Sequence, residues 1–381
     1  MGRASSSRAV VQTGDATFEL HDFALPQIGE QDALLRLERC GICGTDIEQY
    51  DGRLAARGWT EGSTIPGHEP LGVIDQIGAG AAERWGVRAG DRIAVEPLIP
   101  CRRCEACLAG HTTRCSGWGR AEGRHGAGYS YGLLGTGIVP SLLGGYSEYM
   151  YLHPNSVVHR VPADLPPEIA VLFNPLAAGI RWATTEPDLR LGDTIVILGA
   201  GQRGLACVIA AHAAGAGQII VTDLARAAVK LELAHDLGAD ATIVADEEDV
   251  VTRVTELTGG RLADIVVDVT PVATQPILDA IEIVRFGGTV VLAGVKGGPT
   301  AAIDNDRLVF KSITLRGVFT VTSPAYREAI RLLARGGAPY RRLHTASYPL
   351  ERAEEAILHL AGRLDGPPAI NVAVAPGAPS G

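Results

Sequence analysis

The chain has 381 residues, which is enough for two or three domains of ~100 to 200 residues each. Hydrophobic residues make up 46% and charged residues 20% of the chain, which excludes an intrinsically disordered protein. The formal net charge is -9 without a basic tract, and no apolar run approaches the ~18 residues that span a bilayer, so we expect neither a nucleic-acid nor a membrane partner. The polar, Ser-rich start at Met1–Arg8 lacks the apolar segment of a secretory signal, which predicts a cytoplasmic protein.

The first predicted strand, Leu34 to Glu38, is followed by a Gly-flanked bend that contains Cys43, and His68 comes 25 residues after that cysteine. A single Cys or His is more often a core or surface residue than a metal ligand. Here each of the two has a carboxylate close by, Asp46 and Glu69 respectively. A thiolate and an imidazole with neighbouring carboxylates are what an open catalytic zinc site needs.

Four cysteines then follow within 15 positions, with the spacing C-x2-C-x2-C-x7-C. They are Cys101, Cys104, Cys107 and Cys115. This spacing allows one short loop to present four thiolates to a tetrahedral zinc ion, which is typical of a structural site. The main alternative is an iron–sulfur cluster, but the bacterial ferredoxin pattern has its fourth cysteine three residues on and followed by Pro. The remaining thiols, Cys40 and Cys207, are interpreted as inert buried residues.

The second half contains a dinucleotide-binding pattern. The apolar β-branched run Thr194–Leu198 precedes the Gly-rich turn and an Ala-rich helical stretch that reaches Ala214. The turn consists of Gly199, Ala200, Gly201, Gln202, Arg203 and Gly204. Its glycines permit the tight turn, the approach of a pyrophosphate and close packing of helix on strand. A second strand, Gln218 to Thr222, ends at Asp223, whose carboxylate would bind the adenosine ribose and repel a 2′-phosphate, so NAD is favoured over NADP.

Further strands are predicted at residues 241–244, 264–269, 289–295 and 312–318, with helical stretches between them. Six strands that alternate with helices predict an α/β fold with a doubly wound parallel sheet. Helical stretches at residues 324–335 and 351–361 follow the last of these strands.

Taken together, the segment Cys40–Asp46, the Gly67-His68-Glu69 motif, the cysteine cluster and the Gly-rich turn resemble the zinc-dependent medium-chain dehydrogenase/reductase family, in particular its sorbitol and threonine dehydrogenase branch. The resemblance covers nearly the whole chain. It implies a β-rich GroES-like catalytic domain over residues 1–177 with a zinc lobe at about 98–118, a Rossmann NAD-binding domain over 178–318, and a return to the catalytic domain over 319–381. It also implies a homodimer or homotetramer, and residues 283–295 are apolar enough to supply a sheet edge for that contact.

The resemblance implies that a zinc ion held by Cys43 and His68 acts as the Lewis acid on the substrate oxygen while hydride passes to the nicotinamide. Thr45 matches the hydroxyl residue that relays the alcohol proton toward the nicotinamide ribose. Asp46 matches the carboxylate that orients the histidine ligand without touching the metal.

Three positions leave questions open about the metal and the proton relay. Glu69 corresponds to a residue that is a zinc ligand in some members or states of the family and an outer group in others. Asn174 stands where polyol-type members carry a Glu, and its amide would bring no charge to the metal. Glu48 stands where many members carry the His that ends the proton relay, so it is either a relay carboxylate or a solvated surface acid.

The sequence therefore predicts a zinc- and NAD-dependent alcohol dehydrogenase that converts a small-molecule alcohol, a secondary alcohol or a polyol, to a ketone or aldehyde. One alternative is a specialised sugar, cyclitol or terpenoid-alcohol oxidoreductase of the same family, including one that retains its nucleotide through the catalytic cycle. A second alternative, from another class, is a non-catalytic dinucleotide-binding protein, motivated by Asn174 and Glu48.

Overall fold

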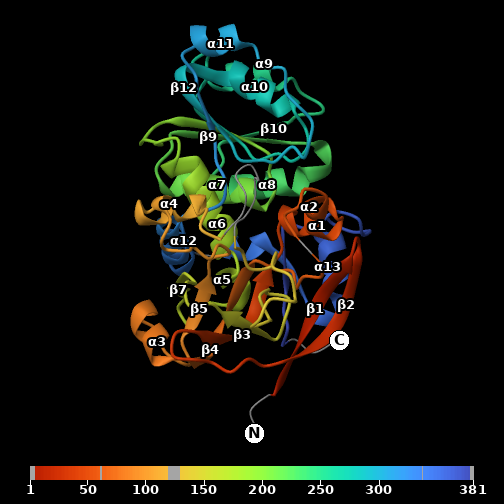
Figure 1. Cartoon of the computed structure of the whole chain (residues 1–381). Coiled ribbons are helices and arrows are strands. Elements are labelled where there is room, and N and C mark those ends of the chain that lie inside the picture. Colours follow the sequence, from red (N-terminus) through yellow and green to blue (C-terminus); the bar gives the residue numbers. More distant parts are fainter. Residues whose placement is uncertain (1–4, 61, 119–128, 337, 378–381) are drawn as a thin grey trace. The chain divides into compact units, whose positions relative to one another are not determined.

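The structure is a computed structural model that describes all residues except 1–4, 61, 119–128, 337 and 378–381 (Figure 1). The chain forms two compact units. The first consists of residues 1–173, 333–335 and 344–381, and the second of residues 174–332 and 336–343.

The first unit is built on a seven-stranded sheet with the strand order β14-β15-β3-β4-β5-β7, in which β6 also pairs with β3. The strands are β3 (Ala33–Gly41), β4 (Glu69–Ile77), β5 (Arg92–Val95), β6 (Tyr149–Leu152), β7 (Val158–Arg160), β14 (His344–Tyr348) and β15 (Asn371–Val374). A separate hairpin is formed by β1 (Ser6–Gly14) and β2 (Thr17–Ala24). Because β15 pairs with β3, the C-terminal segment is part of the same sheet as the strand that leads to Cys43.

Short helices fill the connections of the first unit. They are α1 (Gly44–Tyr50), α2 (Arg53–Ala56), α3 (Ala79–Trp85), α4 (Glu105–Leu108), α5 (Pro167–Ala170) and α13 (Ala353–Leu360), with 3-10 turns at Thr112–Arg114 and Leu350–Arg352. One core cluster includes Leu35, Ile93 and Met150, and a second includes Cys40, Ile42 and Tyr146. The second cluster contains residues at the end of β3 and directly after it, so the segment that carries Cys43 is anchored in the core.

The second unit is a six-stranded parallel sheet with the order β10-β9-β8-β11-β12-β13. The strands are β8 (Thr194–Leu198), β9 (Gln218–Asp223), β10 (Ala241–Val244), β11 (Ala263–Asp268), β12 (Val284–Leu292) and β13 (Thr314–Gly317). The strand order reverses between β8 and β11, which is where such sheets bind ligands at the carboxyl ends of their strands. The predicted α/β fold class with a doubly wound parallel sheet is confirmed.

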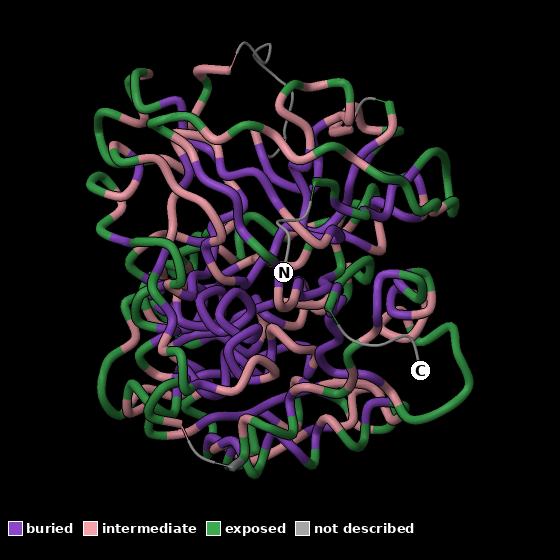
Figure 2. Tube along the Cα trace, turned by 90° about the horizontal axis from the view of Figure 1, so that it is seen from below, coloured by how far each residue is buried: buried purple, intermediate pink, exposed green. Residues whose placement is uncertain are grey.

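Helices cover both faces of this sheet, with α7 and α8 on one side and α9 and α10 on the other (Figure 1). The helices are α6 (Phe173–Ile180), α7 (Gln202–Ala213), α8 (Ala228–Asp236), α9 (Val250–Leu257), α10 (Gln275–Ile283), α11 (Asn305–Phe310) and α12 (Ser323–Arg335), with a π-helix at Arg181–Thr185 and 3-10 turns at Ala225–Ala227 and Ala338–Leu343. Figure 2 shows that much of the interior of the trace is buried, whereas exposed segments are common at its periphery. The apolar strand runs are long and unbroken because both faces of the sheet are covered.

The strand expected to supply a sheet edge does not lie at an edge. β12 pairs with β11 on one side and with β13 on the other. The edge strand is β13, and all four of its residues are exposed. Within this segment Val284, Val290 and Val291 are buried, whereas Phe286 and Val295 are exposed.

No helix in the described part of the chain is long and apolar enough to cross a membrane. All seven cysteines are free thiols.

Candidate active site and cofactor-binding turn

Cys43 is placed by the junction of strand β3 with helix α1. It is the N-cap of α1, and its Sγ accepts a hydrogen bond from the Thr45 N–H at 3.3 Å. The Asp46 carboxylate reaches back and accepts from the Cys43 N–H through Oδ2 at 2.9 Å. This reciprocal capping satisfies N–H groups that a helix start leaves without partners, so the local fold holds Cys43 and Asp46 in one arrangement.

Glu69 is the first residue of strand β4, which pairs with β3, and His68 immediately precedes it. The Cys43 Sγ lies 3.2 Å from His68 Nε2, and His68 Nδ1 lies 3.3 Å from Asp46 Oδ1. Cys43, His68 and Glu69 each offer a ligand atom, and these three atoms lie within 4.8 Å of one another. The two predicted ligands and the questioned carboxylate are therefore brought together in one unit.

Glu69 is positioned by the register of β3 against β4. It lies opposite Gly41 and has no exposed surface. A Cβ at Gly41 would come within 2.5 Å of Glu69 Oε2, so the carboxylate occupies the space that glycine leaves. Any side chain at Gly41 would displace this carboxylate from the cluster.

The residues of this cluster fit a divalent metal ion. A thiol, an imidazole and a carboxylate are the donors that zinc prefers, and burying them without a cation would be costly. Burial by itself would lower the pKa of His68, but the neighbouring Asp46 and Cys43 more than reverse this, and the pKa is raised well above its usual value. This electrostatic environment attracts a positive charge, which a metal ion supplies.

Thr45 and Glu48 lie on helix α1 beyond Cys43. Thr45 is half-buried next to the cysteine, and its backbone contributes the bond to Cys43 Sγ. Glu48 Oε2 accepts a hydrogen bond from Arg57 Nη1 at 3.1 Å, and its side chain is 21% exposed. Glu48 therefore forms an ion pair with Arg57.

The two interpretations of Glu48, a relay carboxylate and a surface acid, differ in the pH profile that they predict. Glu48→Gln is expected to lower kcat/KM by about tenfold and to change its pH dependence, because an amide cannot accept a proton from the relay. Arg57→Gln, which removes the ion-pair partner but keeps the carboxylate, is the control. A Glu48→Gln profile that superimposes on that of the parent protein would identify Glu48 as a surface acid.

Asn174 belongs to the second unit, at the start of helix α6, and both ends of its amide are engaged there. Its Nδ2 donates to Tyr326 Oη at 2.9 Å, and its Oδ1 accepts from Arg203 Nη2 at 3.2 Å. The Arg203 guanidinium also lies over the Trp182 ring, 5.3 Å from its centroid. Within its own unit the amide therefore anchors an arginine of the Gly-rich turn.

The predicted structural site is assembled as one cluster. The Sγ atoms of Cys101, Cys104, Cys107 and Cys115 lie within 4.8 Å of one another. Backbone N–H groups donate to these sulfur atoms, and such bonds, chiefly from Cys107 and Ser116, lower the pKa of Cys104 to about 6. A Cβ at Gly117 would come within 2.1 Å of Cys101 Sγ, so the loop closes tightly around the thiols. Four clustered sulfur ligands fit a closed tetrahedral metal site.

The Gly-rich turn has the geometry that a pyrophosphate requires. Gly199 has a φ of 106°, in the left-handed region, and a Cβ at Gly204 would come within 1.8 Å of the Gly199 carbonyl oxygen. A Cβ at Gly201 would face open space, which leaves room for a ligand next to the backbone. The turn leads directly into helix α7, whose N-terminus favours an anion. Gln202 and Arg203 begin that helix.

Asp223 ends strand β9 next to this turn. Its Oδ2 accepts from the Ala200 N–H at 2.7 Å and its Oδ1 from the Leu224 N–H at 2.8 Å. The carboxylate is thus fixed at the carboxyl edge of the sheet, where an adenosine ribose binds in this type of fold.

A cluster of polar side chains at the same edge of the sheet was not predicted from the sequence. Lys296 Nζ lies 2.8 Å from the fully buried Asp268 and donates to the carbonyl oxygen and hydroxyl of Thr270 at 2.6 and 2.8 Å. A Cβ at Gly199 would contact the Thr270 side chain. The available signal was that Thr270 and Lys296 each follow a predicted strand of the parallel sheet.

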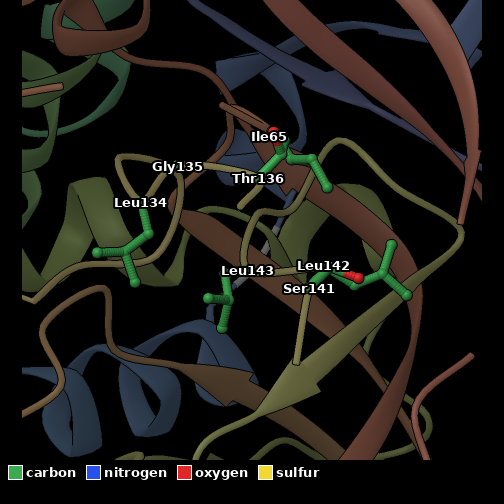
Figure 3. A pocket seen from close by; sticks show the side chains of 7 residues that line it. All are labelled: Ile65, Leu134, Gly135, Thr136, Ser141, Leu142 and Leu143. Atoms are coloured by element: carbon green, nitrogen blue, oxygen red, sulfur yellow. The ribbon is translucent and has the colours of Figure 1, made fainter. Parts of the chain in front are cut away.

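A small pocket of the first unit lies elsewhere (Figure 3). It is lined by Ile65, Leu134, Gly135, Thr136, Ser141, Leu142 and Leu143. None of these residues belongs to the candidate metal site or to the Gly-rich turn.

The first unit with its thiolate, imidazole and carboxylate cluster, and the second with its dinucleotide-binding turn, define a zinc-type dehydrogenase. Residues 29–163 match the alcohol dehydrogenase GroES-like domain, and residues 204–335 match the zinc-binding dehydrogenase family. A Mycobacterium tuberculosis (strain H37Rv) protein named "Probable alcohol dehydrogenase" is 45% identical over 372 residues, which cover 97% of this chain and 98% of that protein. The chain belongs to the zinc-dependent medium-chain dehydrogenase/reductase family and is an oxidoreductase, as the sequence predicts.

Other relatives of the chain include a polyol dehydrogenase and a dehydrogenase of known structure. The chain is 30% identical to a sorbitol dehydrogenase of Bacillus subtilis, with 92% of each chain covered. A zinc-binding dehydrogenase from Sinorhizobium meliloti, solved with NADP bound, superimposes with a TM-score of 0.84 at 25% identity, covering 98% of this chain and all of that one. The dinucleotide-binding fold is therefore shared with an NADP-bound protein.

Proposed function

We propose that the protein is an NAD- and zinc-dependent alcohol dehydrogenase that oxidises a secondary alcohol or a polyol to the corresponding carbonyl compound. The observation that carries this proposal is the convergence of the Cys43, His68 and Glu69 ligand atoms within 4.8 Å in the interior of the first unit. Zinc bound there would serve as the Lewis acid that polarises the substrate oxygen. The polyol preference is supported by the similarity to the sorbitol dehydrogenase and to an erythritol/L-threitol dehydrogenase of Mycolicibacterium smegmatis, which is 29% identical.

The side chains of the first unit have distinct parts in this activity. Cys43 and His68 hold the metal, and Glu69 is the third group able to ligate it. Asp46 touches His68 at Nδ1 and so keeps Nε2 directed toward Cys43. Thr45 is positioned next to Cys43, where its hydroxyl would take the alcohol proton.

The function is tested by following NADH formation at 340 nm with zinc-loaded protein and a panel of secondary alcohols, polyols, sugars, cyclitols and terpenoid alcohols. Oxidation of at least one alcohol class, lost on removal of zinc, is the expected result. A protein that binds NADH but oxidises none of the panel in either direction would instead support a non-catalytic dinucleotide-binding role.

We propose NAD as the cofactor because the Asp223 carboxylate is held at the edge where the adenosine ribose binds. Arg226 and Lys230 also lie near this residue, but a negative charge next to the ribose repels a 2′-phosphate. Asp223→Asn keeps the shape and removes the charge. We expect it to lower the ratio of kcat/KM for NAD to that for NADP by at least about tenfold.

Asp246→Asn is the matched control for this substitution, because Asp246 also accepts a backbone hydrogen bond in the second unit, from the Ala225 N–H at 2.7 Å. The control should leave the cofactor ratio unchanged. If the Asp223 variant keeps the ratio of the parent protein, its charge does not select the cofactor.

We also propose a homo-oligomer that forms through the β13 edge of the parallel sheet. Large apolar side chains are exposed on β13, on helix α11 and on the neighbouring strand β12, namely Leu315, Val309, Phe310 and Phe286. An exposed edge strand with an apolar surface is a site for strand pairing with a second copy. Light scattering of the purified protein would show a monomer mass if the proposal is wrong.

We also propose a cytoplasmic location, because the seven free thiols are typical of a reducing compartment.

A further inference from the structure

Tyr146 is buried in the first unit beside the candidate metal ligands, and its backbone is fixed on three sides. Its N–H donates to the Pro66 carbonyl at 2.9 Å, and the N–H of Gly145 donates to the Gly67 carbonyl at 2.8 Å. Its own carbonyl accepts from the Val10 N–H at 2.8 Å. These bonds hold the tyrosine against the turn that leads directly into His68.

The aromatic ring of Tyr146 packs on that turn. Gly67 has a φ of 90°, and a Cβ at this position would come within 2.4 Å of the ring and within 2.9 Å of Cys40 Sγ. Gly67 is thus required both by its backbone conformation and by the ring that covers it. The Tyr146 ring therefore packs against the residue that immediately precedes His68.

The hydroxyl of Tyr146 has no hydrogen-bond partner among the described residues, although the side chain has no exposed surface. A buried hydroxyl without a partner destabilises a folded protein, and buried tyrosines usually find an acceptor. Tyr131, which is also fully buried, follows that rule. Its Oη lies 2.6 Å from Ser156 Oγ and accepts from the His153 N–H.

The groups that act electrostatically on the Tyr146 hydroxyl include two candidate metal ligands, Cys43 and Glu69, and the Asp46 carboxylate beside His68. Burial is the first cause that raises the pKa of Tyr146 well above its usual value, followed by Asp46, Cys40, Cys43 and Glu69. Asp46 is the foremost of these charges, and its side chain is completely buried. Its Oδ2 accepts from the Cys43 N–H, whereas its Oδ1, 3.3 Å from His68 Nδ1, is buried and, like the Tyr146 hydroxyl, has no hydrogen-bond partner among the described residues. The carboxylate therefore has acceptor capacity to spare.

We propose that Tyr146 is a positioning residue of the metal centre, whose hydroxyl donates to the Asp46 carboxylate when a metal ion holds Cys43 and His68 in place. This inference rests on the proposed metal site. The added donor would fix Asp46 against His68 Nδ1 and so fix the tautomer and the ring orientation of the ligand. In the metal-free protein the same hydroxyl stays buried without a partner and destabilises the folded state.

Tyr146→Phe removes the hydroxyl and keeps the ring on Gly67, so the variant tests the proposal through two effects of opposite sign. Zinc retention at the Cys43 site, measured by competition with a chelator, should weaken by about tenfold, as for other outer groups that support metal ligands. The zinc ion at this site is identified by comparison with Cys43→Ala, which is expected to lose this ion and to keep the ion of the cysteine lobe. The thermal unfolding midpoint of the metal-free variant should equal or exceed that of the metal-free parent protein.

Tyr131→Phe is the matched control, because it removes a fully buried tyrosine hydroxyl that is already bonded. It should lower the unfolding midpoint in both metal states and leave zinc retention at the Cys43 site unchanged. Equal zinc retention in Tyr146→Phe and the parent protein would overturn the inference while leaving the metal site intact. A parent protein that binds no ion dependent on Cys43 would overturn the metal site itself.

Discussion

Cys43→Ala is expected to lower the zinc content from about two ions per chain to about one and to reduce alcohol oxidation by about three orders of magnitude. The thiolate is one of three ligand atoms that lie within 4.8 Å of one another, so its loss leaves only the His68 imidazole and the Glu69 carboxylate. Two ligands do not retain zinc against dilution, and several kcal/mol of Lewis-acid stabilisation are lost with the ion. Elemental analysis on protein purified without chelator, together with steady-state kinetics, measures both effects.

Asn174→Ala is the informative companion of this variant. Both ends of the Asn174 amide are engaged by Tyr326 and Arg203 in the second unit, so we expect the zinc content to stay at that of the parent protein. Kinetic effects of this variant would then arise through Arg203 of the Gly-rich turn. A fall to about one zinc ion in Asn174→Ala as well as in Cys43→Ala would identify the amide as a ligand.

The second large effect is expected at the cysteine lobe. Cys104→Ala should remove the other zinc ion and lower the free energy of unfolding by about 3 kcal/mol, equivalent to a fall of roughly 10 °C in the unfolding midpoint. The four thiols lie in one short loop in which Cys101 is the one buried residue over 101–118, so we expect the metal to supply much of its folding energy. Zinc analysis and thermal unfolding measure the result.

Trp118 offers a local reporter for this variant. Its Nε1 donates to the Ile99 carbonyl at 2.7 Å, and its ring stacks on Tyr129 with centroids 4.5 Å apart. Loss of the lobe should expose this ring and shift its emission to longer wavelength. Cys207→Ala, which removes a buried thiol in helix α7, is the control and should cost about 1 kcal/mol without loss of zinc. Unchanged zinc content in Cys104→Ala would refute the structural site.

Local sequence pattern was sufficient for the second unit. Strands β8 and β10 have the predicted bounds, β9 is one residue longer at its end, and β11 is shifted by one residue toward the N-terminus. Unbroken β-branched runs between Gly-rich turns have few alternatives in a sheet that is covered on both faces. The strand at 289–295 was less well predicted, because β12 begins at Val284 and its first half is not marked by an apolar run.

The chemistry of the two clusters was also predictable, because it resides in residue types and spacing. Four cysteines within 15 positions lie in one short segment, so the spacing alone indicated that they form one site. The pairing of Cys43 with His68 required more, since 25 residues separate them. The recurrence of both in a known motif order supplied that information.

The sequence by itself therefore determined the fold class, the order of the elements and the types of ligand, because these depend on local periodicity and on short spacings. Only the tertiary structure decided which partners each side chain meets. The β3–β4 register sets Glu69 against Gly41, helix packing engages Asn174 with Arg203 and Tyr326, and the glycine turn before His68 admits Tyr146. These contacts join residues that are distant in the chain, and their geometry depends on how strands align and on where a missing Cβ leaves space.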